Sequence, residues 1–185
     1  IDPLVRLAIS HYQFEAIHPF PDGNGRTGRI LNLLLLVNYG FLDSPILYMS
    51  RYILKNRATY YRLLRGVTFE NQWEEWILFI LDAVKFTAEW TEEKICSICS
   101  LMEKVGKNIG ENFPKIYSPQ LMDVIFSQPY CRIKTLVECG IAKRQTAAKY
   151  IDALVDCGVL EVEPTPGPEK LYSNRQFIDL LRREN

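Results

Sequence analysis

The sequence HPFPDGNGRTGR at residues 18–29 constrains the local fold more than any other stretch of the chain. Its two prolines end a helical pattern over residues 1–17, because proline lacks the amide hydrogen that a helix interior needs. Helical spacing resumes around residues 24–26 and continues to Gly40, which is a suitable C-terminal stop. The sequence therefore predicts two helices joined by a loop, with glycines where the second helix begins.

The same stretch combines the groups that phosphate chemistry uses. Glycines let backbone amides approach an anion closely, and each arginine can bind two phosphate oxygens at once. A carboxylate beside phosphates commonly holds magnesium. A histidine can accept a proton from a hydroxyl near neutral pH. A helix N-terminus, with its unpaired amides and positive dipole end, favours the same ligand. The residues that supply these groups are His18, Asp22, Gly23, Gly25, Arg26 and Arg29.

The composition is typical of a soluble globular protein, with 48% hydrophobic and 24% charged residues. Lysine plus arginine equals aspartate plus glutamate at 22 each, so no overall field directs the chain to nucleic acid or a membrane. The longest apolar run, residues 30–37, is too short to span a bilayer. The five cysteines are scattered, and the C-x-x-C at residues 96–99 has no second pair to complete a zinc site. We expect a cytoplasmic protein without membrane contact.

The rest of the chain predicts a mainly α-helical protein of two domains. Helices are expected over residues 50–66 and from 72 to about 107, the latter as one helix or as two joined near residue 90. Glycines and a proline at 106–114 mark a boundary, which gives domains at 1–115 and 116–185. The second domain contains three short predicted helices, two strands around a proline-rich turn, and a last helix, at residues 118–129, 131–139, 143–157, 159–163, 170–173 and from 174. This order resembles a winged helix-turn-helix domain with a small β-hairpin wing.

Basic residues gather within residues 131–150 of the second domain. A helix with Lys143, Arg144, Gln145 and Thr146 at its N-terminal end would suit the major groove of DNA. Docking to a protein, or within the chain, is the alternative, since the whole sequence carries no net charge. Both partners stay open at this point.

Residues 18–29 match the Fic (filamentation induced by cAMP) family signature H-x-F-x-[D/E]-G-N-G-R-x-x-R at every specified position. The resemblance extends to the helix before this motif, to residues 47–52 and to Tyr60-Tyr61. Together with its C-terminal domain, the chain resembles the back half of a longer Fic protein of the bacterial type. The fold that this resemblance implies is a Fic helical bundle followed by the winged helix-turn-helix domain.

The resemblance also implies a protein adenylyltransferase, which transfers AMP from ATP to a serine, threonine or tyrosine hydroxyl of a target protein with Mg²⁺ as cofactor. By the family's pattern, His18 would be the general base, Asp22 would hold magnesium, and Phe20 would anchor the loop in the core. Tyr60 and Tyr61 would line the nucleoside pocket. The residues expected to contact the nucleotide and its phosphates are Gly23, Asn24, Gly25, Arg26, Thr27, Gly28 and Arg29.

Other interpretations stay open beside this one. The protein could be a DNA-binding regulator whose Fic part is a sensor, or a Fic enzyme that uses another nucleotide or phosphoryl donor or removes AMP. Residues 1–185 contain neither the family's target-docking flap nor its inhibitory [S/T]-x-x-x-E-[G/N] motif, so the chain by itself could be inactive. A homodimer is a further expectation. Gly28 is also expected to serve close helix packing, and His11 is interpreted as a packing or surface residue.

Overall fold

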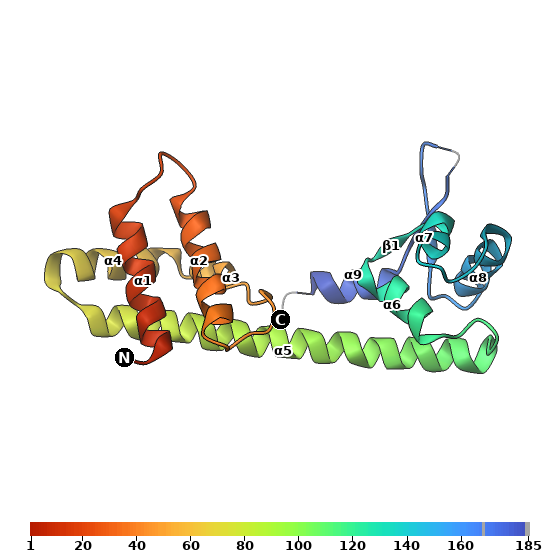
Figure 1. The fold of residues 1–185 in the computed structure, drawn as a ribbon, viewed down its shortest axis with the longest axis horizontal. Coiled ribbons are helices and arrows are strands. Elements are labelled where there is room, and N and C mark those ends of the chain that lie inside the picture. The colour runs from red at the N-terminus through yellow and green to blue at the C-terminus, as the bar shows by residue number, and fades with distance from the viewer. Residues whose placement is uncertain (168, 184–185) are drawn as a thin grey trace. The chain divides into compact units, whose positions relative to one another are not determined.

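A computed structural model describes residues 1–167 and 169–183 (Figure 1). The chain divides into two compact units, Ile1–Glu92 and Glu93–Asn185, and each unit has its own hydrophobic core. Helices dominate both units, and a small three-stranded sheet lies in the second, which confirms the predicted fold class. Within the described residues, no helix combines the length and the apolar character needed to cross a bilayer.

The first unit is built from helices alone. Its elements are α1 (Pro3–Ile17), α2 (Asn24–Asn38), α3 (Ser50–Lys55), α4 (Arg57–Glu70) and the N-terminal half of α5 (Trp73–Asn112). The core contains Trp76, which is fully buried and donates its indole N–H to the carbonyl of Ala8 over 2.9 Å. This bond fixes α5 against α1, the helix that leads into the predicted phosphate loop.

Local signals in the sequence account for the start of α1 but not for the break between α3 and α4. Asp2 caps α1 by accepting the amide of Leu4 at 2.8 Å, and Pro3 occupies the first turn. The single helix predicted over residues 50–66 is wrong, since Asn56 leaves the helical conformation and separates α3 from α4. Neither proline nor glycine marks that break.

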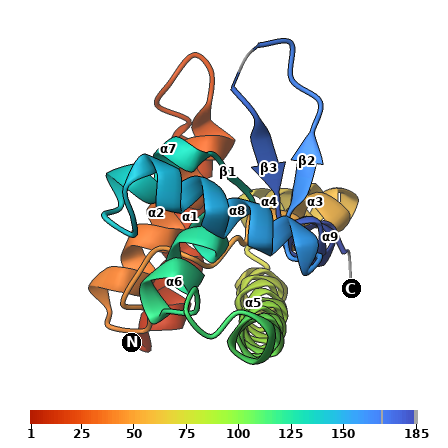
Figure 2. The same cartoon turned by 90° about the vertical axis from the view of Figure 1, so that its right-hand side faces the viewer.

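The second unit combines the C-terminal half of α5 with short helices and the sheet. Its further elements are α6 (Pro119–Ser127), β1 (Tyr130–Cys131), α7 (Ile133–Glu138), α8 (Arg144–Asp156), β2 (Glu161–Glu163), β3 (Leu171–Ser173) and α9 (Arg175–Arg182). The strands pair antiparallel in the order β1-β3-β2, and β2 and β3 form a hairpin with a long connection (Figure 2). These helices and the hairpin are the parts expected of a winged helix-turn-helix domain. The predicted turn includes residue 168, which lies outside the described residues.

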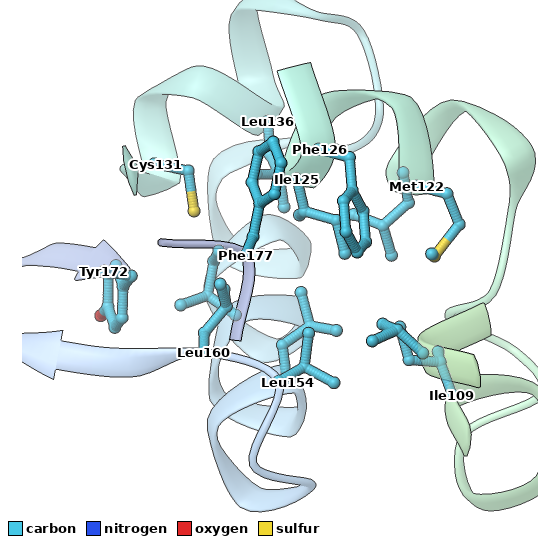
Figure 3. Packing of buried hydrophobic residues seen from close by; sticks show 14 of the residues in the cluster. Ile109, Met122, Ile125, Phe126, Cys131, Leu136, Leu154, Leu160, Tyr172 and Phe177 are labelled. Atoms are coloured by element: carbon cyan, nitrogen blue, oxygen red, sulfur yellow. The ribbon is translucent and has the colours of Figure 1, made fainter. Parts of the chain in front are cut away.

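One core holds the second unit together. Phe126 of α6 and Phe177 of α9 bring their ring centroids within 5.2 Å of each other, and Leu136 and Leu154 from α7 and α8 complete the same cluster (Figure 3). Ile109 of α5 also belongs to this cluster. Part of α5 before residue 115 therefore packs with the C-terminal elements, whereas the domain boundary at residue 115 stays a prediction.

Two sequence expectations for this unit require correction. Gly106 and Gly110 lie inside α5, which continues to Asn112, because neighbouring side chains of the helix are buried in the core of the second unit. The helix predicted over residues 131–139 is shorter, since Cys131 pairs with Tyr172 of β3 and α7 begins only at Ile133.

Candidate functional site

The loop of the predicted phosphate motif connects α1 to α2 (Figure 1). His18 ends α1 in the left-handed conformation, with φ +50°, and its amide donates to the carbonyl of Phe14 at 3.0 Å. Gly23 precedes α2 at φ +83°, a conformation that side chains with a Cβ rarely adopt. The chain therefore turns sharply at both ends of the loop, and the imidazole of His18 stays exposed beside it.

Asn24 holds the loop closed. Its side-chain oxygen accepts the amide of Phe20 at 2.9 Å, and its side-chain nitrogen donates to the carbonyl of the same residue at 2.5 Å. Asn24 is buried, while Phe20 is 47% exposed and its ring lies near Phe14. The expectation that the Phe20 ring anchors the loop in the core is wrong, because the Phe20 backbone makes the bonds that fix the loop.

The open side of the loop presents the first turn of α2. Asn24, Gly25 and Arg26 are its first residues, and the first amides of a helix have no acceptor within it. Arg26 pairs with Asp22 at 3.2 Å, and both side chains are largely exposed. Such a pair contributes little to stability, so both groups can exchange partners when a ligand arrives. The Thr27 hydroxyl donates to the Gly23 carbonyl at 3.1 Å.

Arg29 lies over the same turn, and Glu15 of α1 is close to it. A Cβ added at Gly25 would lie 3.1 Å from Nη1 of Arg29 and 4.0 Å from Oε1 of Glu15. Burial raises the pKa of the Glu15 carboxyl, against the opposing effects of Arg29 and then His18. The cation, the carboxylate and the imidazole therefore lie within electrostatic range of one another at the mouth of the loop.

Beneath the loop, α1 and α2 approach closely at Gly28. A Cβ there would lie 2.6 Å from Oε1 of Glu15, 3.1 Å from Cδ1 of Phe14 and 3.3 Å from Cε1 of His11. Gly28 is buried, and the two helices lie close together at this residue, as its expected packing role requires. Its expected phosphate contact stays a prediction.

His11 is buried below this contact. Its Nε2 lies 3.1 Å from the Tyr60 hydroxyl, and its ring stacks on Trp76 with centroids 5.9 Å apart. Burial, followed by the charge of Arg29, lowers the pKa of His11 from 6.5 to about 4, so the ring is neutral at physiological pH. Of the packing and surface roles open for His11, the structure shows packing, with a polar bond to Tyr60 that the sequence did not predict.

Glu15 was not recognised from the sequence as part of the site. A signal for it exists, since His11, Glu15 and His18 are four and three residues apart and therefore share one face of a helix that leads into the loop. Asn32 is fully buried on α2, one turn after Gly28.

Two family models match the chain. The Fic/DOC family matches residues 1–36, which contain α1, the loop and most of α2, and the C-terminal domain of the SoFic-like protein adenylyltransferases matches residues 101–177. The part of the chain that contains the loop thus matches the Fic/DOC family.

Curated relatives support the same assignment. The chain is 30% identical to protein adenylyltransferase fic-1 of Caenorhabditis elegans over 124 residues, which cover 67% of this chain and 22% of the relative. It is 28% identical to protein adenylyltransferase Fic of Drosophila willistoni over 127 residues, which cover 67% of this chain and 24% of the relative. Over 64 residues it is 42% identical to fic-1 of Caenorhabditis briggsae, with 35% of this chain and 11% of the relative covered. The chain thus spans a quarter or less of these relatives' lengths.

The two tyrosines expected to line the nucleoside pocket of the Fic site differ in their surroundings. Tyr60 is only 6% exposed and packs in the core of the first unit, where burial and then Glu15 raise its pKa. Tyr61 is 50% exposed, and the guanidinium of Arg57 lies 5.6 Å from its ring centroid. For both residues, the contact with a nucleoside stays a prediction.

Asp22 is the carboxylate that the Fic motif offers to a metal. Within residues 1–167 and 169–183, no group of three or more His, Cys, Asp or Glu side chains could hold a metal ion. Magnesium typically binds one or two protein carboxylates together with substrate phosphates, so a single exposed carboxylate beside a phosphate site fits its needs. The Asp22 oxygens contact the Gly23 amide at 2.6 Å and Arg26 at 3.2 Å.

The predicted DNA-contact residues begin α8 in the second unit. Lys143 precedes the helix, and Arg144, Gln145 and Thr146 form its first turn. All four side chains are exposed, as a surface contact requires. DNA as their partner stays a prediction.

Proposed function

We propose that the protein transfers AMP from ATP to a hydroxyl group of a target protein. The observation that carries this proposal is the mouth of the loop, where the first turn of α2 meets Arg29 and His18. The relatives are named protein adenylyltransferases, which agrees with such a use of this site.

The triphosphate would lie along the start of α2. The amides of Asn24, Gly25 and Arg26 would bind phosphate oxygens, since an anion is favoured at the positive end of the helix. Arg29 would pair with the outer phosphates in bidentate fashion, and Arg26 would exchange its exposed partner Asp22 for the same anion.

The chemistry would be an in-line displacement at the α-phosphorus. His18 would accept the proton of the attacking hydroxyl while a bond forms from that oxygen to the α-phosphorus. The bond between the α-phosphorus and the bridging oxygen would break, and pyrophosphate would leave with its charge balanced by the arginines. Magnesium held by Asp22 would supply further charge neutralisation between the phosphates.

Nucleotide binding can be measured on this chain directly. Calorimetry with ATP and Mg²⁺ should give a binding heat, and Arg29→Ala should weaken binding by about tenfold or more because a charge-assisted contact is lost. His18→Ala should retain binding, because the imidazole acts on the attacking hydroxyl. Heat that is absent, or that Arg29→Ala leaves unchanged, contradicts the proposed phosphate site.

Transfer is measured with the complete gene product and ATP labelled on its α-phosphate. Label should appear on protein, and His18→Ala should abolish it while ATP binding persists. ATP labelled on the γ-phosphate is the control, because transfer of AMP leaves that label on pyrophosphate. Label from the γ-position on protein would instead indicate phosphoryl transfer.

A further inference from the structure

A hollow of about 580 Å³ lies in the second unit, between α7, α8 and the hairpin formed by β2 and β3. Ligand pockets in proteins typically measure a few hundred to about 1,000 Å³. Among the described residues, Ile133, Val137 and Ala148 supply apolar lining, and Tyr172 of β3 also lines the hollow. The nucleotide site described above lies in the other unit, so this hollow requires a separate explanation.

Four cations surround this apolar lining: Arg132, Lys134, Arg144 and Lys170. Arg132 contacts the carboxylate of Glu169 at 3.4 Å and the carbonyl of the same residue at 3.4 Å, which joins the start of α7 to the hairpin. Its charge is therefore largely offset.

The other three cations of the hollow differ in their pairing. Lys134 pairs with Glu138 over 3.1 Å, whereas Arg144 and Lys170 have no carboxylate within ion-pair distance among the described residues. Asp152 of α8 is the one further carboxylate in the described lining. The hollow thus combines an apolar lining, called the floor below, with an excess of positively charged side chains, called the rim.

We propose that this hollow binds an acidic peptide segment of a partner protein, with an apolar side chain of that segment seated on the floor. Anchoring of an apolar side chain in a pocket is how protein interfaces commonly gain most of their affinity. Charge complementarity at the rim then raises the association rate and selects acidic segments. Arg144 and Lys170 are the cations available for this role.

Duplex DNA fits the same hollow less well. The phosphate backbone of duplex DNA offers neither an apolar group for Ile133 and Val137 nor a hydrogen-bond donor for Asp152, and it is repelled by that carboxylate. Thymine methyl groups and cytosine amino groups supply these contacts only where a base edge reaches into the hollow. An extended acidic peptide offers an apolar side chain, hydrogen-bond donors and negative charge together. Its backbone amides can donate to Asp152 while its carboxylates face Arg144. The observations therefore favour a peptide over a nucleic acid as occupant.

The proposal is tested with the full chain and a short fluorescent peptide in which aspartates flank one phenylalanine. Fluorescence anisotropy should show binding, and replacement of the aspartates by lysines should abolish it. Arg144→Glu should weaken binding by about tenfold, because it reverses a rim charge. Ala148→Leu, which fills the floor with a good helix former, should weaken binding by a similar factor. Lys104→Glu, an exposed charge reversal on α5 away from the hollow, should leave binding unchanged.

Three results would overturn the proposal. One is an acidic peptide that does not bind, or binds no better than its lysine version, while circular dichroism shows the chain folded. Another is a peptide affinity that stays as strong in Arg144→Glu and in Ala148→Leu as it is in the control variant Lys104→Glu. The third comes from a parallel measurement with labelled duplex DNA, namely binding tighter than that of the peptide at the same salt concentration and unaffected by Ala148→Leu. Failure of this proposal leaves the nucleotide site of the first unit untouched.

Discussion

The substitution Gly28→Ala tests whether the close approach of α1 and α2 has the dimensions described above. Gly28 lies inside α2, where alanine alone would stabilise a helix by about 1 kcal/mol relative to glycine. The new methyl group would lie 2.6 Å from a Glu15 oxygen and within 3.1–3.3 Å of ring carbons of Phe14 and His11. The Glu15 oxygen can swing away, whereas His11 is held between Tyr60 and Trp76.

The two effects oppose each other, and the second should win. Overpacking of a tight contact costs about 1–3 kcal/mol, which leaves a net loss of up to about 2 kcal/mol for Gly28→Ala. Gly66→Ala is the matched control in the same unit, because the three nearest atoms to its methyl group would all belong to Gln72. That side chain is exposed and its end bonds to Glu70 alone among the described residues, so it can shift at little cost. That control should be neutral or gain up to about 1 kcal/mol.

Urea unfolding followed by tryptophan fluorescence measures both variants. Trp73, Trp76 and Trp90 all lie in the first unit, so the signal reports the unit that carries both substitutions. The midpoints should differ by the equivalent of about 1–2 kcal/mol in the free energy of unfolding, with unchanged slopes. If Gly28→Ala is as stable as Gly66→Ala, the contact between Gly28 and α1 is looser than the structure shows, and the packing argument fails.

Two further predictions concern the same unit. The pKa of His11 is lowered from 6.5 to about 4 in the folded state. The free energy of unfolding is therefore highest above pH 6.5 and decreases as the pH falls toward 4, because the unfolded chain binds the proton first. Between about pH 7.5 and about pH 5 this amounts to a loss of about 2 kcal/mol, measured as the shift in urea midpoint, and a His11→Gln variant with the same shift would contradict it. Asn24→Ala removes both side-chain bonds to the Phe20 backbone and should cost about 1–3 kcal/mol, with weaker ATP binding in calorimetry because the loop is no longer closed. Wild-type nucleotide affinity in that variant would show that the closed loop is not needed for the anion site.

Much of the fold could be predicted because its signals are local. The prolines and Gly23 of the motif end one helix and start the next within a few residues, and the structure places α2 where the pattern predicts it. The strand β1 could not be found in this way, because Tyr130 pairs with Ser173 far along the chain. The continuity of α5 through Gly106 has the same kind of cause, since burial of neighbouring residues outweighs the roughly 1 kcal/mol by which glycine weakens a helix.

The site shows the same division between what is local and what is not. The motif fixes the order of His18, the glycines and the arginines, and thereby predicts an anion site at a helix N-terminus. It does not reveal that the Asn24 side chain bonds to the Phe20 backbone within the loop, because those two bonds depend on how the loop turns. Glu15 was missed for a related reason, since its proximity to Arg29 depends on how closely α1 approaches α2, and Gly28 permits that approach. The glycine that the motif leaves unspecified therefore has a structural consequence for the cation that the motif requires.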